Sequence, residues 1–209
     1  MKEELPKNGI LVVGTGTLAR WAAQLLEAAG ELVYGFVPTR EHPEKEQDNL
    51  SILPPITRAR MWKLIKQHQA DYVIALVDPV ARERMATALF EKTQRVARPV
   101  IHDSVYVAPT ARLGGGVLLF PHVVIGISCD IGGYVLIESL TAVGAGTKVD
   151  DFVNIGSGCQ IGENCEIASY AWIGRGCVIY EGVRIGKGAQ IRPGSIVRDH
   201  VKPGEIYGE

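Results

Sequence analysis

The chain has 209 residues, of which 46% are hydrophobic and 22% are charged, and its formal net charge is −1. This composition is typical of a globular protein, and the near-neutral charge excludes a large basic surface for nucleic acid or anionic membranes. No apolar stretch approaches the roughly 18 residues that a membrane-spanning helix needs, so no membrane partner is expected.

The amino terminus and the cysteines favour the cytoplasm. The first residues, MKEELPKNG, contain acids and lack the apolar core of a signal peptide. The four cysteines occur without paired C-x-x-C spacing, which favours a reducing compartment over a disulfide framework. We therefore expect a cytoplasmic protein.

Glycine marks a division of the chain into two parts. No glycine occurs between Gly35 and Gly114, and most of the 24 glycines lie between Gly114 and Gly208. Such a shift in composition indicates two domains. We expect a small α/β domain over residues 1–100 and a repeat domain over residues 101–209.

The first domain alternates apolar strands with amphipathic helices. Strands are expected at residues 9–14, 31–37 and 70–77, with one helix that ends at Gly30 and others at 56–69 and 79–94. Strands that alternate with helices predict a Rossmann-like parallel sheet with right-handed crossovers.

The junction between the first strand and the first helix reads GTGTLAR and is a candidate phosphate site. Backbone N–H groups at a helix N-terminus can face an anion, and Gly14, Thr15, Gly16 and Thr17 would let it approach closely. A tight turn without a ligand explains the same residues about equally well. A dinucleotide fingerprint would have a third glycine in place of Ala19 and an acid after the second strand, where the chain reads Pro-Thr. NAD is therefore not expected.

From residue 101 the chain repeats every six residues. Every sixth position from Ile101 to Val197 is aliphatic, and the position four residues later, from Val105 to Val201, is always small or β-branched. A period of six fits neither a helix nor a hairpin sheet, but it fits a short strand followed by a tight corner. The sequence therefore predicts a parallel β-helix of five to six triangular coils, with both kinds of residue pointing inward and glycine or Asn at the corners.

All four cysteines fall on the small inward position of this repeat. We expect them to be buried thiols that act as small hydrophobes, rather than metal ligands or nucleophiles. They are Cys129, Cys159, Cys165 and Cys177.

Four features carry a resemblance to a known family: VVGTGTLAR, ADYVIALVDPVARERM, RPVIHDSVYVAPTARLGGGV and the uninterrupted hexads. In this order they resemble the sugar acyltransferases typified by sialic acid O-acetyltransferases and bacillosamine-pathway N-acetyltransferases. The resemblance covers nearly the whole chain. It implies a left-handed β-helix, a homotrimer, acetyl-CoA bound between adjacent helices, and a nucleotide-sugar held partly by the α/β domain.

The resemblance also implies where the chemistry should occur. In these enzymes a His-acid pair deprotonates the acceptor amine or hydroxyl, because the reaction needs a base near neutral pKa oriented by a carboxylate. Matching the hexads without gaps puts this pair at Ala145 and Gly146, which cannot move a proton. A second histidine matches Asn154, whose amide can donate a hydrogen bond to a thioester carbonyl. Acetyl-CoA is expected near Asn154, Arg175 and Gly194.

A replacement base has few candidates in the repeat domain. No histidine lies between residues 122 and 200, so a shift of register would not supply one. His122 is the candidate base, although an exposed corner histidine is the simpler interpretation. A metal site would need three converging histidines, so no metal is expected. Asp150 and Asp151 form a paired carboxylate on the next corner, for which a solvated pair is the simpler interpretation. Tyr134 and Glu138 are further outward candidates without distinguishing spacing.

Two functions stay open at this point. The first is an acetyl-CoA-dependent acetyltransferase acting on an amino or hydroxyl group of a nucleotide-activated sugar, with an amine favoured because a neutral amine needs less help from a base. The second is a non-catalytic trimeric homologue that binds a ligand or acts as a scaffold. A sugar nucleotidyltransferase would need a longer first domain than about a hundred residues.

Overall fold

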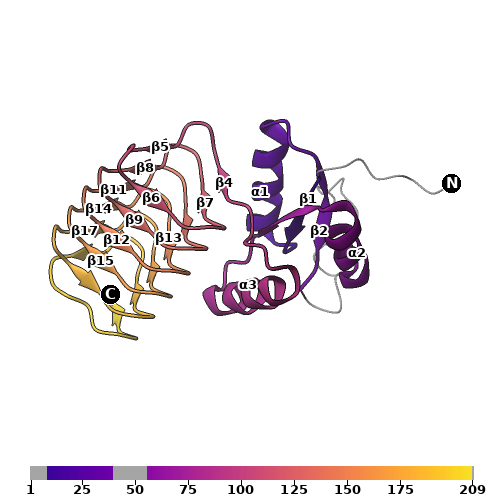
Figure 1. The fold of residues 1–209 in the computed structure, drawn as a ribbon. Coiled ribbons are helices and arrows are strands. Elements are labelled where there is room, and N and C mark those ends of the chain that lie inside the picture. Colours follow the sequence, from indigo (N-terminus) through magenta and orange to yellow (C-terminus); the bar gives the residue numbers. More distant parts are fainter. Residues whose placement is uncertain (1–8, 40–55, 209) are drawn as a thin grey trace. The chain divides into compact units, whose positions relative to one another are not determined.

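The computed structural model describes residues 9–39 and 56–208. The chain divides into two compact units, Met1–Arg98 and Pro99–Glu209, both drawn in Figure 1. Within the described residues, the first unit contains all the α-helices, and the second is built from short strands.

The first unit is a parallel three-stranded sheet with three helices. Strand β1 (Ile10–Val13) lies between β2 (Val33–Val37) and β3 (Asp71–Ile74). The helices are α1 (Thr17–Ala28), α2 (Arg58–His68) and α3 (Pro79–Thr93). The strands are almost wholly buried, as the continuous apolar runs in the sequence predict. Because the strands are parallel, the loops that follow them meet at one edge of the sheet.

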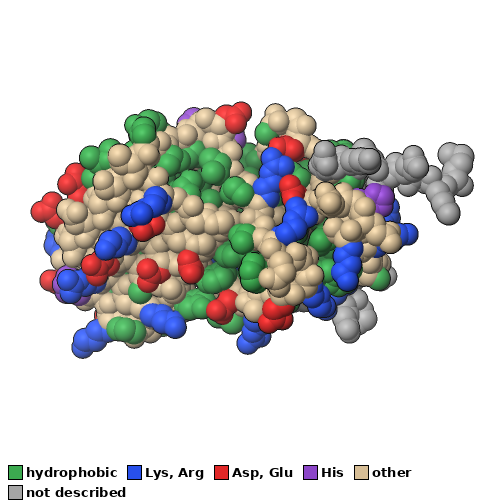
Figure 2. Space-filling model, in the orientation of Figure 1, with side chains coloured by type: hydrophobic (Ala, Val, Ile, Leu, Met, Phe, Trp, Pro, Cys, Tyr) green, Lys and Arg blue, Asp and Glu red, His purple; other side chains and the backbone are tan. Residues whose placement is uncertain are grey.

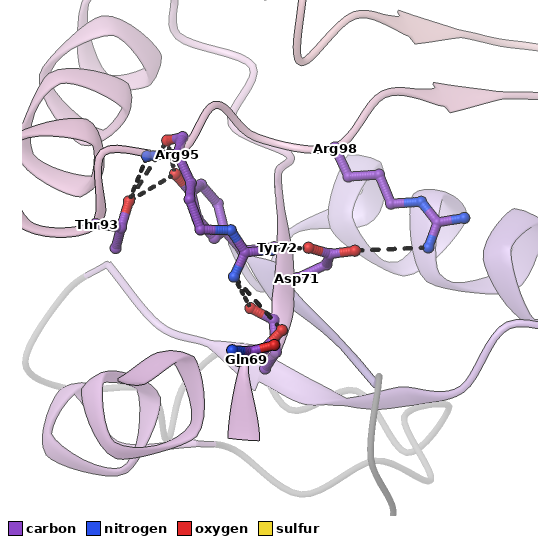
Figure 3. Close-up of polar contacts among 7 residues, drawn as sticks. Gln69, Asp71, Tyr72, Thr93, Arg95 and Arg98 are labelled. Carbon is purple, nitrogen blue, oxygen red and sulfur yellow. Dashed lines mark hydrogen bonds and ion pairs between the residues drawn. The ribbon is translucent and has the colours of Figure 1, made fainter. Parts of the chain in front are cut away.

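At the opposite edge, the segment that leads out of the first unit is fastened to β3 (Figure 3). Arg95 forms an ion pair with Asp71, and Arg98 forms one with Glu31. The Tyr72 hydroxyl donates a hydrogen bond to the Arg95 carbonyl, and the Arg98 N–H donates to the Tyr72 carbonyl at 2.8 Å. Burial raises the pKa of the Tyr72 hydroxyl, which keeps it protonated as a donor. These contacts hold the chain in place up to Arg98, the last residue of the first unit.

The second unit is a β-solenoid of the left-handed β-helix type, built from three parallel sheets (Figure 1). Sheet B contains β4 (Val100–Ile101), β7 (Leu118–Leu119), β10 (Leu136–Ile137), β13 (Asn154–Ile155), β16 (Trp172–Ile173), β19 (Gln190–Ile191) and β21 (Ile206–Tyr207). Sheet C contains β5 (Tyr106–Val107), β8 (Val124–Ile125), β11 (Ala142–Val143), β14 (Gln160–Ile161), β17 (Val178–Ile179) and β20 (Ile196–Val197). Sheet D contains β6 (Arg112–Leu113), β9 (Asp130–Ile131), β12 (Lys148–Val149), β15 (Glu166–Ile167) and β18 (Arg184–Ile185). Each coil has 18 residues, as the pairing of Val143 with Ile161 shows.

The interior of the solenoid confirms the predicted inward positions. The aliphatic residues from Leu119 to Val197 and the small residues from Val117 to Ala189 are at most 4% exposed. The first coil is less buried, with Ile101 42% exposed, because a terminal coil has a neighbouring coil on one side only. All four cysteines are free and buried, and burial raises the pKa of the Cys129 and Cys165 thiols. Cys129 and Cys165 are therefore unsuited to act as thiolate nucleophiles.

Two inward threonines also form hydrogen bonds with backbone groups of the corresponding corner on the next coil. The Thr147 hydroxyl donates to the Gly162 carbonyl at 2.8 Å and accepts from the Cys165 N–H at 3.1 Å. Thr141 does the same one turn earlier, with the Gly156 carbonyl and the Cys159 N–H. A buried N–H or carbonyl without a partner is costly, so these two threonines stabilise the corner as well as filling a small volume.

The corners carry left-handed backbone conformations, as predicted, but their residues are more varied than glycine and Asn. His122 and Leu140 have φ angles of 61° and 64°. On another edge the aromatic rings of Tyr134, Phe152 and Tyr170 stack, with centroids 5.2 and 5.8 Å apart. This conformation costs a bulky residue of order 1 kcal/mol, and stacking offsets part of that cost.

The last coil departs from the predicted register. The repeat places Val201 at a small inward position four residues after Val197, but Val201 instead forms a parallel bridge with Ile185 and is buried as an aliphatic strand residue. Ile191 likewise pairs with Tyr207. The final coil is therefore two residues shorter than the others. The prediction for Val201 is wrong because the regular six-residue step ends at Val197.

The outward side chains differ sharply between sheets. On sheet D basic and acidic residues alternate, and Arg184 forms an ion pair with Glu166 at 3.3 Å. Figure 2 shows such alternation of basic and acidic side chains across the solenoid. The outward side chains of sheet D are Arg112, Asp130, Lys148, Glu166 and Arg184. Those of sheet C, called here the apolar face, are Tyr106, Val124, Ala142, Gln160, Val178 and Ile196.

Candidate functional site

The loop between β1 and α1 lies at the edge of the sheet where the strands end. Gly14 has φ 127°, and a Cβ there would lie 2.6 Å from the Ala75 carbonyl oxygen, so this position requires glycine. Thr15 is half-buried, whereas Gly16 and Thr17 are exposed. Helix α1 begins without a side-chain cap, which leaves the N–H groups of its first turn for solvent or an anion.

Two arginines shape the same edge, and neither was singled out from the sequence. Arg82 in α3 is fully buried, and its guanidinium donates to the carbonyls of Leu76 and Val77 at 2.6 and 3.2 Å. Burial lowers the pKa of Arg82 to about 10, so the side chain stays charged at neutral pH and fixes the loop after β3. Arg58, the first residue of α2, donates to the Thr39 carbonyl at 2.9 Å after β2. A buried cation at this edge follows from tertiary packing that no local pattern encodes.

In the solenoid, the candidate residues lie on two different edges of the prism. The turns that join sheet B to sheet C form the B–C edge, which carries His122, Arg175 and Gly194. The turns that join sheet C to sheet D form the C–D edge, which carries Ala145 and Gly146. Within one chain, the apolar face therefore separates His122 from the position expected for the base.

The structure places the remaining predicted residues in distinct surroundings. His122 is exposed, and its backbone N–H donates to the Ser104 hydroxyl at 2.9 Å. Arg175 is also exposed, and Gly194 has φ 74°. Asn154 projects from β13 in sheet B and is 3% exposed. The structure thus gathers His122, Arg175 and Gly194 on one edge and leaves Asn154 on the adjoining face.

Two of the other outward carboxylates bond to the backbone. Asp151 accepts a hydrogen bond from the Gly133 N–H at 2.6 Å, and Glu138 accepts one from the Ser157 N–H at 3.1 Å. Each of these bonds links one coil to the next. They indicate that Asp151 and Glu138 stabilise turns of the solenoid.

Glu163 is an outward residue of the C–D edge that was not identified from the hexads. It lies one coil after Ala145, and the following Asn164 N–H donates to the Ala145 carbonyl at 2.8 Å. The sequence signal that would have found it is the period of 18, which places residue 163 above residue 145. A comparison of the six-residue repeats alone does not show which residues lie above one another on adjacent coils.

Neither a metal-binding cluster nor a membrane-spanning helix is found among the described residues. Across residues 9–39 and 56–208, no group of three or more His, Cys, Asp or Glu side chains is arranged to hold a metal ion. None of the helices there has the length and apolar character needed to cross a membrane.

The comparisons with known proteins concern the solenoid and the whole fold. Residues 140–174 and 166–199 match the bacterial transferase hexapeptide family. No curated protein matches the chain in sequence. Three solved structures are similar over both units: a histidine-to-asparagine mutant of perosamine N-acetyltransferase from Caulobacter crescentus in complex with CoA and GDP-perosamine, the acetyltransferase domain of PglB from Neisseria gonorrhoeae in complex with acetyl coenzyme A, and WeeI from Acinetobacter baumannii.

These structural similarities extend over nearly the full length of each chain. The perosamine enzyme is 20% identical, with 96% of this chain and 93% of that chain covered and a TM-score of 0.86. The PglB domain is 20% identical with a TM-score of 0.82, and WeeI is 23% identical with a TM-score of 0.80, each with 95% of both chains covered. The chain thus carries bacterial transferase hexapeptide repeats and has the fold of these three structures.

Proposed function

We propose that this protein is an acetyl-CoA-dependent N-acetyltransferase that acts on an amino group of a nucleotide-activated sugar. The observation that carries the proposal is the similarity over both units in the same order, with a TM-score of 0.86 to an enzyme in complex with CoA and GDP-perosamine. The fold alone does not define an activity, so the proposal also depends on the chemistry at the two edges.

The nucleotide-sugar is proposed to bind at the edge of the sheet formed by the loops after β1 and β3. The strand order β2-β1-β3 makes this edge a topological switch point, where open α/β sheets bind ligands. The uncapped first turn of α1 would face a phosphate, with Gly14, Thr15, Gly16 and Thr17 as the contacting loop. Arg82 holds the neighbouring loop in place through its carbonyl contacts.

The acyl-transfer site is proposed to form between copies in a homotrimer. The apolar face exposes large side chains, with Tyr106 58%, Val124 42% and Ile196 47% exposed. If three prisms direct this face toward a three-fold axis, the C–D edge of each meets the B–C edge of the next. Residues separated in one chain, Ala145 on one edge and His122 on the other, would then line the same crevice.

Acetyl-CoA is proposed to occupy this crevice as co-substrate. Arg175 and Gly194 lie on the B–C edge that the neighbouring copy presents, and Asn154 lies on the adjoining sheet B. The exposed guanidinium of Arg175 suits a phosphate. Asn154 has the amide donor that a thioester carbonyl needs, but it is 3% exposed in the single chain, so Arg175 is the stronger candidate contact. No metal is required for this chemistry.

An amine is the acceptor that this chain is best suited to acetylate. Loss of a general base costs about 10²- to 10⁴-fold in rate, and Ala145-Gly146 cannot supply one. A neutral amine is already a nucleophile, so positioning alone lowers its barrier substantially. A hydroxyl group would depend far more on the missing base.

A non-catalytic trimeric homologue is the second candidate function. The observation that favours it is the absence of any proton-transfer group at Ala145 and Gly146. Such a protein would keep the fold and the trimer as a scaffold, or as a binder of a nucleotide-sugar, without transferring an acetyl group.

Calorimetry with acetyl-CoA, compared with CoA, tests between the two functions. An enzyme is expected to bind acetyl-CoA with micromolar affinity and to release CoA when a nucleotide-linked amino sugar such as GDP-perosamine is added. The control is a nucleotide-linked sugar that lacks an amino group, which should release no CoA. If no binding is detected at millimolar acetyl-CoA, the result contradicts the acetyltransferase function, and the non-catalytic scaffold remains.

A further inference from the structure

We infer that Glu163 accepts the proton in acetyl transfer, one coil along from the position expected for the base. This inference rests on the proposed function and names the group that would replace the His-acid pair. Three observations support it: the stacking of coils at the C–D edge, the space around Gly146, and the partners of the other outward carboxylates.

The first observation is that Ala145 and Glu163 occupy equivalent places on successive coils. Strand β11 pairs with β14 before the turn, and β12 pairs with β15 after it, so the two turns lie one above the other. A backbone hydrogen bond of 2.8 Å from Asn164 to Ala145 joins them directly. Successive coils are about 4.8 Å apart, a distance that the longer side chain of Glu163 can span.

The second observation is that the next coil already occupies the space above Gly146. Gly146 has φ 69°, and a Cβ there would lie 2.4 Å from Oδ1 of Asn164. An acid at position 146 would therefore displace the Asn164 side chain and would adopt an unfavourable backbone conformation. The side chain of Ala145 is a single methyl group. In this stack of turns the next coil carries the polar residues Glu163 and Asn164.

The third observation is that the Glu163 carboxylate is exposed and, within the described chain, forms no hydrogen bond or ion pair. Glu138 and Asp151 instead accept bonds from backbone N–H groups of adjacent coils. On the C–D edge the equivalent residue one coil before Ala145 is Ile127, which cannot accept a proton. Glu163 thus lies one coil from the expected site, on the same edge, with a carboxylate that can contact a substrate.

The chemistry balances with a carboxylate in this role. The nitrogen lone pair of the sugar amine attacks the thioester carbonyl carbon, a C–N bond forms, and the nitrogen becomes cationic. The negative charge of Glu163 stabilises the cationic nitrogen, and the carboxylate then accepts the N–H proton, which is acidic once nitrogen carries this charge. The C–S bond then breaks, its electron pair leaves with sulfur as the CoA thiolate, and the thiolate takes up the proton from Glu163, which regenerates the carboxylate. The products are the N-acetyl sugar and CoA.

The test compares Glu163→Gln with Glu181→Gln, the matched variant one coil further along the same edge. With acetyl-CoA and a panel of nucleotide-linked amino sugars that includes GDP-perosamine, Glu163→Gln is expected to lower kcat at least about 100-fold. Binding of acetyl-CoA by calorimetry should be unchanged, which separates a proton-transfer role from a binding or structural one. Glu181→Gln should retain kcat within about two-fold, and Glu163→Asp should recover part of the activity.

The outcomes distinguish this inference from the function on which it rests. If the wild-type chain is active and Glu163→Gln has the same kcat, the role of Glu163 is overturned, whereas the proposed transferase function is retained. An equal loss of kcat in Glu163→Gln and Glu181→Gln would also overturn the role of Glu163, because any carboxylate of this edge would then have the same effect. If the wild type acetylates no acceptor in the panel, the proposed function fails, and the role of Glu163 fails with it.

Discussion

At the scale of single residues, Gly14 shows how backbone geometry limits the nucleotide-sugar loop. Its φ of 127° lies where residues with a Cβ are strained, and the Ala75 carbonyl oxygen would be 2.6 Å from that Cβ. Gly16, two residues later, has φ −72° and open space around it. The two glycines of the same motif therefore have different physical roles.

Gly14→Ala is expected to destabilise the first unit by about 1–3 kcal/mol, because it adds strain and a contact with the loop after β3. The matched variant Gly16→Ala should cost less than about 1 kcal/mol. Thermal unfolding followed by helical circular dichroism measures the difference, since all the described helices lie in this unit. Equal stability of the two variants would contradict the role assigned to Gly14.

At the scale of elements, Thr141 and Thr147 each link a corner of the solenoid to the corresponding corner of the next coil. Thr147→Val keeps the shape of the side chain but leaves the buried Cys165 N–H and the Gly162 carbonyl without this partner. We expect a loss of about 1–3 kcal/mol in the free energy of unfolding, measured by urea denaturation. Thr110→Val is the control: Thr110 accepts from the Ser128 N–H at an exposed corner, where water can replace it. A larger effect at Thr110 would refute the argument.

The elements also show how far the sequence predicts this fold. The hexads predict every inward position up to Val197 because burial at a fixed period leaves an aliphatic residue at each step. They fail at Val201, where two residues fewer in the last coil change the pairing. Glu163 was missed for a related reason, since contacts between coils join residues 18 apart. Arg82 gave no local signal, because its partners are backbone carbonyls.

At the scale of the whole molecule, the three sheets present different surfaces, and the apolar face is proposed to be where copies meet. Val124→Arg places a charge on that face, on the strand next to its terminal strand β5, and is expected to convert the proposed trimer to monomers, because an unpaired buried charge is costly. Glu166→Arg makes a comparable change on sheet D and should leave the trimer intact. Sedimentation at micromolar concentration measures both. A wild-type chain that sediments as a monomer would contradict the intersubunit site.

The coil length of 18 residues also limits how this chain can change in length during evolution. Gain or loss of a full coil leaves every later strand in its own sheet. Loss of a single hexad would instead turn all later strands by one sheet, so that charged residues such as Lys148 would enter the apolar face. Insertions and deletions are thus expected in whole coils or at the ends of the solenoid. The shortened last coil, after which β21 is the one named strand that has to keep its place, is a change at the end of the solenoid.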